Sequence, residues 1–544
     1  MNRFFCSKDC PDLCEFTVEH SGSGMVFSPA EKEEGRNGFV CRKLKGFYER
    51  EVENGAPFDE EGIEKAGDLI RKNMGKPFLY IRGSGSLAYN MGYWDQLFSR
   101  IPGAVFVEGG PCDETAIAAQ ERDFGVCANP PVENLEGAET IISFGKNARV
   151  TSPHLYGYMK ELKQKGCRIA YIDPVKSESR RLADLYIQNT PGTDGLLAAA
   201  LLMHRNGEEG WEELIDEADV NRSDFLKLSG MLRDGKTGII IGWGLQRYSN
   251  GFNANRWINR LAVKTANVGR LYFGRSSKSG MVTPAAEETG TINIGRLPVA
   301  LAEGEFPLAV IVAANPAMTY PDSNMWDKGL KKTTLISVDT NLNETTTHAD
   351  AFIRVGGMFA QPDMMGSYFF PKEARRDVKV FDVLSDQEAA SKLARLLDIE
   401  LDIKPIDEVE RFQIPPREYR EEKLDLLRPS EGEGFRLITS SHMAWLNSQV
   451  PPSLGENVSH IYISEETAAE TSFGDGDIIE AYNSTGSFTG VCRISDMVRG
   501  RDILVYKNRT MKEGRPNAAI PAGLTDSKNA YNYYDAFVSL RRKE

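Results

Sequence analysis

From about Phe78 onward the chain repeats one theme, and this repeat limits its fold more than any other feature. A short apolar run rich in β-branched residues is followed by a Gly, Asn or Asp turn and then by a helical stretch. Such alternation predicts βαβ units, in which parallel sheets are covered by helices on both faces, and therefore an α/β fold class. The apolar runs are Phe78–Ile81, Thr140–Phe144, Arg168–Ile172, Gly238–Ile241, Leu308–Ala313 and Thr334–Val338.

The turns that follow these runs indicate where ligands bind. In open α/β sheets, ligands occupy the crevice outside the carboxyl ends of the strands. Glycine lets the backbone approach a phosphate there, and Asp or Asn can bind a ribose or a base. The turns are Gly83-Ser84-Gly85, Gly145-Lys146-Asn147, Asp173-Pro174, Gly242-Trp243-Gly244, Asn315-Pro316 and Asp339-Thr340-Asn341.

The pattern changes near Glu400. The charged, Pro-containing stretch from Glu400 to Pro429 predicts a linker. From Phe435 onward, short alternating segments separated by Gly and Asp turns predict a compact β-barrel-like domain. Because 544 residues exceed what one hydrophobic core can serve, we expect three or four domains.

Charge and hydropathy exclude two classes of partner. The formal net charge is -13, with acidic and basic residues interspersed, whereas a nucleic-acid-binding surface needs a concentrated basic face. No apolar run approaches the ~18 residues of a membrane span, and the start of the chain lacks the pattern of a secretory signal. We therefore expect a cytoplasmic protein with neither nucleic acid nor membrane insertion.

The eight cysteines are unevenly spaced. Cys6, Cys10, Cys14 and Cys41 fall within the first 41 residues, and the others are scattered. Three thiolates in one tight loop and a fourth returned by a hairpin-like excursion suit the four corners of a [4Fe–4S] cubane. Zinc is the main alternative, although its structural sites usually bring two close pairs, and unliganded cysteines are the third.

The N-terminal region resembles the cluster domain of the dimethyl-sulfoxide-reductase superfamily, enzymes that use bis(molybdopterin guanine dinucleotide). The resemblance lies in Cys-x3-Cys-Pro-Asp-x-Cys, from Cys6 to Cys14, and in the run from Gly38 to Lys43. It implies a [4Fe–4S] cluster on Cys6, Cys10, Cys14 and Cys41, with Lys43 as the electron-relay lysine between cluster and pterin. A fixed cation beside a cluster stabilises its more negative, reduced state.

Later segments resemble the same superfamily in the same order and imply two dinucleotide sites. An Asp194 carboxylate can accept two hydrogen bonds from the N1 and N2 donors of guanine. Each motif alone also fits a tight turn or a helix cap, but six or more of them in fixed order are hard to explain in that way. For the first dinucleotide the implied contacts are Gly145, Asn147, Asp173, Gly192, Thr193 and Asp194. For the second they are Gly242, Gly244, Asn315, Asp339 and Thr340. The segments that resemble the capping β domain add Asn447 and Asn517.

The metal ligand of that superfamily comes from a loop just before the glycine–asparagine turn, and Cys112 stands at this place. A thiolate at a helix N-terminus has a lowered pKa and is a soft ligand suited to Mo or W. Formate dehydrogenases resembling this family follow the ligand with His, whereas this chain has Asp113, which counts against formate. Asp113, Glu114 and Asp12 are candidates for proton transfer, and His442 lies in a segment that resembles the cofactor-facing loop.

The resemblance implies four domains. Residues 1–50 would hold the cluster, 51–136 with 306–430 would form a discontinuous α/β domain that binds one dinucleotide, and 137–305 would form a Rossmann-like domain that binds the other. Residues 431–544 would form the C-terminal β-barrel cap. The boundaries follow the changes of sequence pattern described above.

The function implied is that of a Mo or W oxidoreductase acting on a small-molecule substrate. With one cluster motif in the chain, electrons would leave to an external carrier, either a ferredoxin-like protein or a partner Fe–S or flavin subunit. A hetero-oligomer would supply the parts of the substrate funnel that this short chain lacks. Two alternatives stay open: a non-redox hydratase-type enzyme, and a metal-free electron-transfer subunit of a larger complex.

Overall fold

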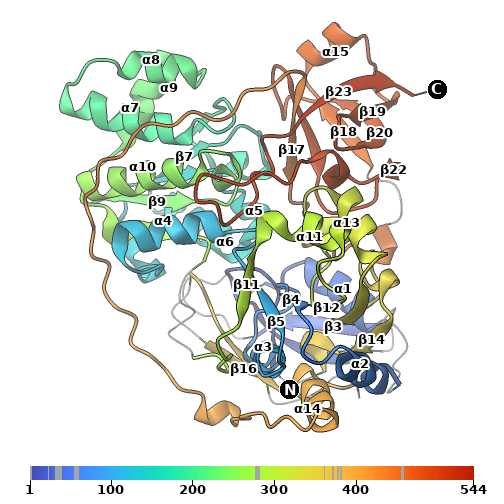
Figure 1. The fold of residues 1–544 in the computed structure, drawn as a ribbon. Coiled ribbons are helices and arrows are strands. Elements are labelled where there is room, and N and C mark those ends of the chain that lie inside the picture. The colour runs from blue at the N-terminus through green and yellow to red at the C-terminus, as the bar shows by residue number, and fades with distance from the viewer. Residues whose placement is uncertain are drawn as a thin grey trace.

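A computed structural model describes residues 3–21, 24–30, 39–53, 61–275, 282–360, 362–369, 373–376, 379, 383–454 and 459–543. Within them lie two parallel sheets with helices on both faces, a C-terminal barrel and a small N-terminal sheet (Figure 1). The predicted fold class is therefore confirmed. No helix in these ranges is both long enough and apolar enough to span a bilayer.

The first parallel sheet has five strands in the order β10-β9-β6-β7-β8. Alternate side chains point to opposite faces of a strand, so Ile142 and Phe144 pack under α4, α7 and α10, while Ile141 packs under α6. The strands are β6 (Thr140–Phe144), β7 (Arg168–Ile172), β8 (Leu185–Ile187), β9 (Thr237–Ile241) and β10 (Leu271–Phe273). The helices are α4 (Glu114–Phe124), α6 (Pro153–Gln164), α7 (Asp194–Asn206) and α10 (Gly251–Lys264).

The second parallel sheet has six strands in the order β11-β5-β4-β12-β13-β14. Leu79 and Ile81 of β4 pack against α11 and α13, whereas Phe78 and Tyr80 pack against α2, α3 and α14 on the other face. The strands are β4 (Phe78–Arg82), β5 (Ala104–Glu108), β11 (Gly290–Asn293), β12 (Leu308–Val312), β13 (Thr334–Asp339) and β14 (Ala351–Arg354). The helices are α2 (Glu61–Lys72), α3 (Gly92–Ser99), α11 (Leu297–Glu303), α13 (Ser323–Leu330) and α14 (Asp386–Leu396).

Two elements lie in a different part from the one that the predicted boundaries give them. β11 and α11 fall within 137–305 but belong to the six-stranded sheet, because β11 pairs with β5. Conversely, α4 falls within 51–136, yet its Ala116 and Phe124 lie in the core of the five-stranded sheet. The chain thus crosses between the two parts more often than the sequence pattern indicates.

The C-terminal strands close into a barrel. Their order is β18-β21-β17-β23-β19-β20-β22, and a further parallel pairing of β18 with β20 closes a ring of six strands. This confirms the predicted barrel. The strands are β17 (Phe435–Ser440), β18 (His460–Ile463), β19 (Ile478–Tyr482), β20 (Ser487–Ile494), β21 (Asp502–Tyr506), β22 (Glu513–Gly514) and β23 (Phe537–Arg542).

The predicted linker is an extended strap over the outside of the five-stranded part, drawn in orange in Figure 1. Between 401 and 434 it contains only one short 3₁₀ turn, Ile406–Glu408. The strap is nevertheless well anchored: the N–H groups of Glu418 and Arg420 donate to the carbonyls of Phe124 and Asp123 at the end of α4. It therefore holds α4 as well as joining two domains.

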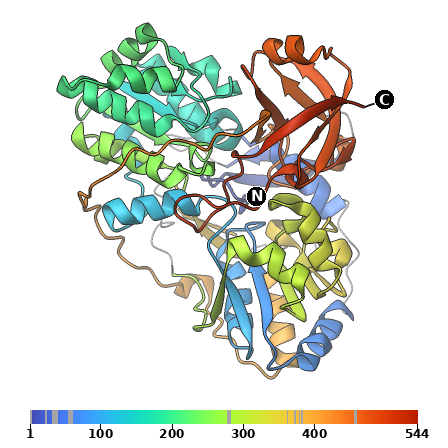
Figure 2. The same ribbon diagram turned by 45° about the horizontal axis from the view of Figure 1, so that its top comes forward.

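The N-terminal part lies where the other three parts meet (Figure 2). It consists of β1 (Arg3–Phe5), β2 (Glu15–Ser21), β3 (Gly24–Pro29) and α1 (Lys43–Tyr48). Its residues Lys43, Ser7 and Asp9 form hydrogen bonds with one residue in each of the other parts. The partners are Val150 in the five-stranded part, Ser86 in the six-stranded part and Asn447 in the barrel region. The loops of this part that carry cysteines are therefore central in the molecule.

Candidate active site and cofactor pockets

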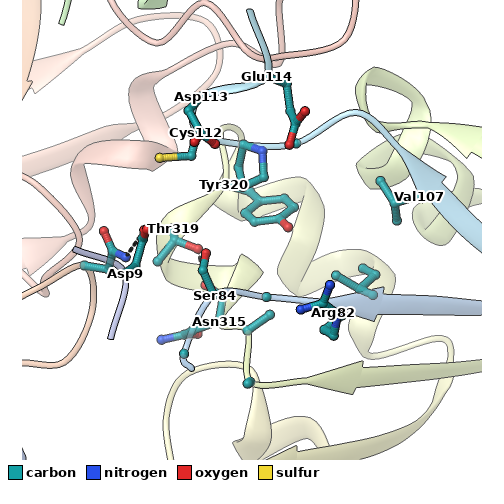
Figure 3. A pocket seen from close by; sticks show the side chains of 18 of the residues that line it. Asp9, Arg82, Ser84, Val107, Cys112, Asp113, Glu114, Asn315, Thr319 and Tyr320 are labelled. Carbon is teal, nitrogen blue, oxygen red and sulfur yellow. Dashed lines mark hydrogen bonds between the residues drawn. The ribbon is translucent and has the colours of Figure 1, made fainter. Parts of the chain in front are cut away.

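A cavity of about 420 Å³, which we call the Cys112 cavity, lies between the two α/β parts and the barrel. Cys112 follows β5 and directly precedes Asp113, the N-cap of α4. In Figure 3, Cys112, Asp113 and Glu114 form one wall of the cavity, Ser84 and Asn315 lie opposite, and the Tyr320 ring stands between them. The predicted metal ligand therefore lies in a cavity that is lined by residues from both parallel sheets.

The thiol of Cys112 is held by Arg247, whose Nη2 donates to Sγ over 3.4 Å. Burial raises the pKa of Cys112 to about 12, and Arg247 opposes that rise only in part. Burial thus outweighs the lowering of this pKa that is expected from the helix N-terminus, because desolvation of the thiolate is the larger effect. A bound cation would reverse that balance, since metal coordination deprotonates a thiol.

Carboxylates surround the thiol, and most of them have partners. Asp113 receives two hydrogen bonds from Arg275 Nη1, at 3.0 and 3.3 Å. Asp9 accepts one from Asn447 Nδ2 over 3.3 Å, and burial raises its pKa. Lys507 lines the same cavity, and burial lowers its pKa to about 8.

One of the three predicted proton-transfer residues, Asp12, differs in position from the expectation. Asp12 does not line the Cys112 cavity: its Oδ2 accepts a hydrogen bond from the N–H of His154 at the start of α6. Asp9, three residues earlier, lines the cavity instead. Glu114 does line the cavity, as expected.

A second cavity, the five-stranded pocket, lies at the carboxyl ends of β6, β7 and β9. It brings together five of the predicted dinucleotide contacts: Gly145, Asn147, Asp173, Asp194 and Gly244. Burial raises the pKa values of Asp173 and Asp194 to about 7. Asp194 Oδ1 has no hydrogen-bond partner in the described part of the chain, and neither does Trp243 Nε1.

These two unpartnered atoms test whether a nucleotide fits the five-stranded pocket. A buried acceptor and a buried donor without partners are costly and call for a ligand with complementary groups. The N–H donors of guanine complement Asp194, and a phosphate or carbonyl oxygen complements Trp243. The residues present therefore fit a guanine dinucleotide.

A third cavity, the six-stranded pocket, lies at the carboxyl ends of β12 and β13. It brings together the predicted residues Asn315, Asp339 and Thr340. Here the polar side chains bond to one another: Asn315 Nδ2 donates to Glu344 over 2.7 Å, and Asp339 Oδ1 accepts from the N–H of Thr340 over 2.7 Å. Burial raises the pKa of Asp339.

The predicted division of residues between two dinucleotides needs one correction. Gly242 and Gly244 were grouped with Asn315 and Asp339, but they follow β9 and belong to the five-stranded part. A Cβ at Gly242 would overlap the carbonyl of Gly145, so glycine lets the ends of β6 and β9 approach. Because β9 lies beside β6, both turns serve one pocket.

Besides Gly242, four predicted site residues line none of these cavities, and each makes contacts within the protein instead. Gly192 adopts φ +83° and packs on Pro429. Thr193 donates to the carbonyl of Thr190 over 2.6 Å. Asn517 is buried and donates to the carbonyls of Met318 and Tyr320, so its amide is used within the protein.

His442, the fourth, is not among the residues that line the Cys112 cavity. Its ring stacks on Trp445 with centroids 3.9 Å apart, and its Nδ1 accepts from the N–H of Ala444. Burial and the nearby Arg509 lower the pKa of His442 to about 4. In contrast, Asn447 does line the Cys112 cavity.

The four N-terminal cysteines line a small, mainly apolar cavity, which we call the cysteine cavity. Its walls include Leu13, Val40, Leu44, Phe47 and Leu446. Burial raises the pKa values of Cys10 and Cys14 well above the usual value, and the charges of the neighbouring cysteines add to the rise. Four thiolates that disfavour one another in a dry site require a cationic centre, so the residue set fits an iron–sulfur cluster.

In the ranges that the structure describes, no group of three or more His, Cys, Asp or Glu side chains is arranged around a position for a single ion. Thiolates of a cubane each bind a different iron, so they stand further apart than four ligands of one zinc. Lys43 lines the cavity and donates to the carbonyl of Val150 over 2.7 Å.

Sequence reasoning did not assign the basic residues that line the Cys112 cavity, which are Arg82, Arg247, Arg275 and Lys507. Arg247 and Lys507 both line this cavity and the five-stranded pocket. Arg247 closes the glycine turn after β9 and Lys507 follows β21, so their places after strand ends were the available signal. What the sequence lacks is the contact between the barrel and the sheet, which brings the two side chains together.

Two parallel sheets, a capping barrel and cavities at the strand ends define a cofactor-dependent α/β enzyme class. Comparison with known families narrows it. Residues 63–353 match the molybdopterin oxidoreductase family, and residues 435–537 match the Molydopterin dinucleotide binding domain. The chain belongs to the molybdopterin oxidoreductase family, which confirms the resemblance to the dimethyl-sulfoxide-reductase superfamily.

Two relatives come from Bacillus subtilis (strain 168). The chain is 24% identical over 399 residues to the probable oxidoreductase YyaE, a match that covers 65% of this chain and 58% of that protein. It is 25% identical over 431 residues to the probable oxidoreductase YoaE, covering 67% and 63%. The chain thus spans about three fifths of the length of these relatives.

One solved structure resembles the whole fold. Acetylene hydratase from Pelobacter acetylenicus superposes with a TM-score of 0.75, covering 100% of both chains at 11% sequence identity. At this identity the likeness concerns the fold alone.

Proposed function

We propose that this protein is the catalytic subunit of a molybdenum or tungsten oxidoreductase that holds two molybdopterin guanine dinucleotides and one [4Fe–4S] cluster. Electrons pass between a small substrate at the metal and an external carrier, by way of the cluster. The carrier is a ferredoxin-like protein or a partner Fe–S or flavin subunit, and the cytoplasm is the expected compartment.

The convergence of four cavities carries this proposal. The Cys112 cavity shares Arg247 and Lys507 with the five-stranded pocket, and Asn315 and Gln449 with the six-stranded pocket. The cysteine cavity shares Thr151 with the first of these pockets and Lys8 with the second. A cofactor with two nucleotide arms and a metal between them matches this layout.

The residues present would divide the work as follows. Cys112 would be the protein ligand of the metal, and Arg247 fixes the orientation of its Sγ. Asp194 would bind guanine, and Lys43 stands beside the cluster site. When bound, the pterin-held metal supplies the redox chemistry.

Around the metal site, the protein's own contribution is to hold charges in place. Arg275 fixes Asp113, and Asn447 fixes Asp9, so two carboxylates face the cavity in defined orientations. Tyr320, whose pKa burial raises, remains a neutral wall residue. This set offers hydrogen-bond acceptors to a substrate, and Asp113 in place of His still argues against formate.

Metal and nucleotide analysis of the isolated protein tests the proposal. We expect Mo or W, iron in the four-to-one ratio of a cubane to the chain, and one GMP released by acid hydrolysis for each nucleotide pocket. Steady consumption of an electron acceptor during turnover would exclude a hydratase. Protein that contains neither Mo nor W after expression with both would support a metal-free electron-transfer subunit instead.

A further inference from the structure

The segment between Cys6 and Cys10 separates two of the cavities. The carbonyl of Ser7 accepts a hydrogen bond from the N–H of Leu87 over 2.7 Å, and the Ser7 and Ser86 hydroxyls lie 3.0 Å apart. Ser86 lines the six-stranded pocket. One face of this segment is thus turned to the cysteine cavity, and the other is fastened to the loop that walls the six-stranded pocket.

Lys8 lies in this segment, between the two cavities. It is 3% exposed, and it lines both the cysteine cavity and the six-stranded pocket. Its ammonium forms an ion pair with Glu51, which is 1% exposed, and lies 5.4 Å from the centre of the Phe47 ring. A lysine charge is therefore fixed beside the cluster site, where the cysteine cavity borders the six-stranded pocket.

Glu51 lies directly behind the wall of the six-stranded pocket. Gly357 lines that pocket, and a Cβ placed on Gly357 would be 2.8 Å from Glu51 Oε2. This oxygen has no hydrogen-bond partner in the described ranges. Buried ion pairs contribute little net stability compared with apolar residues of the same volume, so stability alone does not account for the pair.

We propose that the Lys8–Glu51 ion pair sets the reduction potential of the cluster from the side of the second dinucleotide, Lys8 raising it and Glu51 lowering it. Lys8 would not bind the cluster; it would act on the reduction potential through the electrostatic effect of its charge. The inference rests on the [4Fe–4S] cluster of the proposed function. Its physical basis is that the reduced cluster carries one more negative charge, which a nearby cation stabilises and a nearby anion destabilises.

Potentiometric titration of the cluster in the holoprotein, followed by EPR, tests this in three variants. Lys8→Met should shift the potential to more negative values, and Glu51→Gln should shift it to more positive values. A tenfold change in the equilibrium for reduction, ~59 mV for one electron, is the expected size of each shift. The double variant Lys8→Met/Glu51→Gln should return close to the wild-type potential, because both charges are gone.

A second buried pair provides the matched control. Asp123 and Arg256 have side chains 3% and 9% exposed and lie in the five-stranded part. Asp123→Asn should lower the thermal stability and leave the potential unchanged. A merely structural role of Lys8–Glu51 would give the same result as this control.

The possible results distinguish failure of this inference from failure of the proposed function. Shifts of opposite sign support the inference. Should Lys8→Met lose its cluster, Glu51→Gln alone decides it, because a more positive potential supports the inference and an unmoved or more negative potential overturns it. A cluster present in every variant with an unmoved potential, or with both single variants shifted the same way, overturns the inference alone. Wild-type protein without cubane iron overturns the proposed function and this inference with it.

Discussion

The five-stranded and six-stranded pockets lie at equivalent places in two parallel sheets, yet they present their polar groups differently. In the five-stranded pocket, Asp194 Oδ1 and Trp243 Nε1 are buried without partners among the described residues. In the six-stranded pocket, Asp339 and Asn315 are already bonded to neighbours. A ligand in the five-stranded pocket can therefore bond to polar atoms that have no other partner. In the six-stranded pocket, a ligand has to replace hydrogen bonds that the protein already makes.

This difference teaches where affinity should come from. A buried unsatisfied carboxylate oxygen costs free energy that a ligand donor recovers, so it adds to binding. A carboxylate that already accepts hydrogen bonds gains little more from a ligand. We expect the five-stranded pocket to discriminate the base and the six-stranded pocket to bind more weakly through side chains.

The largest expected effect on turnover comes from Cys112, which lies outside both pockets and serves as a reference for variants within them. Cys112→Ala should reduce turnover by more than about 100-fold, because it removes the proposed metal ligand. Both GMP equivalents and the cluster spectrum should remain, since neither nucleotide pocket includes Cys112. Acceptor-linked kinetics with GMP analysis measure this, and retained activity would remove Cys112 from the mechanism.

The second effect compares equivalent acids. Asp194→Asn should weaken retention of one nucleotide by roughly 10- to 100-fold, which corresponds to the ~1.5–3 kcal/mol of a charged hydrogen bond. Asp339→Asn should have a smaller effect, because Asp339 accepts from Thr340 and Asn343 within the protein. GMP release during dialysis measures both variants. Equal losses would contradict the difference between the pockets.

The third effect concerns pH in cofactor-free protein. Burial raises the pKa of Asp173 and of Asp194 from 3.8 to about 7, so the native state binds more protons than the unfolded chain between these values. The free energy of unfolding should therefore fall as pH rises from about 4 to 7, by at most ~4 kcal/mol for each group.

Denaturant unfolding at several pH values measures this slope. Asp194→Asn should flatten it, whereas Thr193→Ser, a neighbouring change that adds no titrating group, should leave it in place. An increase of stability with pH over this range, and no change in Asp194→Asn, would show that these acids are not buried as described.

The smallest effect is expected at His442. Its ring stacks on Trp445 outside the Cys112 cavity, and its pKa of about 4 keeps it neutral at physiological pH. His442→Gln should leave kcat within about twofold, since no charge near the metal site changes. A large loss of kcat without a change of stability would instead show that His442 takes part in catalysis.

Much of this arrangement follows from local sequence. The predicted runs Thr140–Phe144 and Leu308–Ala313 contain the strands β6 (Thr140–Phe144) and β12 (Leu308–Val312), because continuous β-branched and apolar residues suit strands buried on both faces. The glycine and Asp turns lie at the strand ends that form the pockets, because parallel strands bring their carboxyl ends to one edge. Cys112 and the strand-end acids could therefore be found without a structure.

The parts that sequence did not reveal depend on contacts between distant segments. Gly244 was grouped with residues of the six-stranded pocket, although it lines the five-stranded one, because strand order, with β9 beside β6, does not follow chain order. Asp9 replaced Asp12 because the side-chain direction within a cysteine loop depends on what packs beside it. The raised pKa of Cys112 reflects burial, which a helix-end argument does not include.

The strap between the six-stranded part and the barrel has a consequence for how the protein is made. Glu422 of the strap binds both Arg122 and Arg256, and Lys264 binds Glu421, so contacts that stabilise α4 and α10 join residues more than 150 positions apart. Such long loops close slowly, and only after the strap has been synthesised. We expect α4, and with it the loop of Cys112, to become rigid late in synthesis, which leaves a time window in which a bulky cofactor can enter. Strap cleavage by protease should accordingly be faster in protein expressed without the cofactor than in loaded protein.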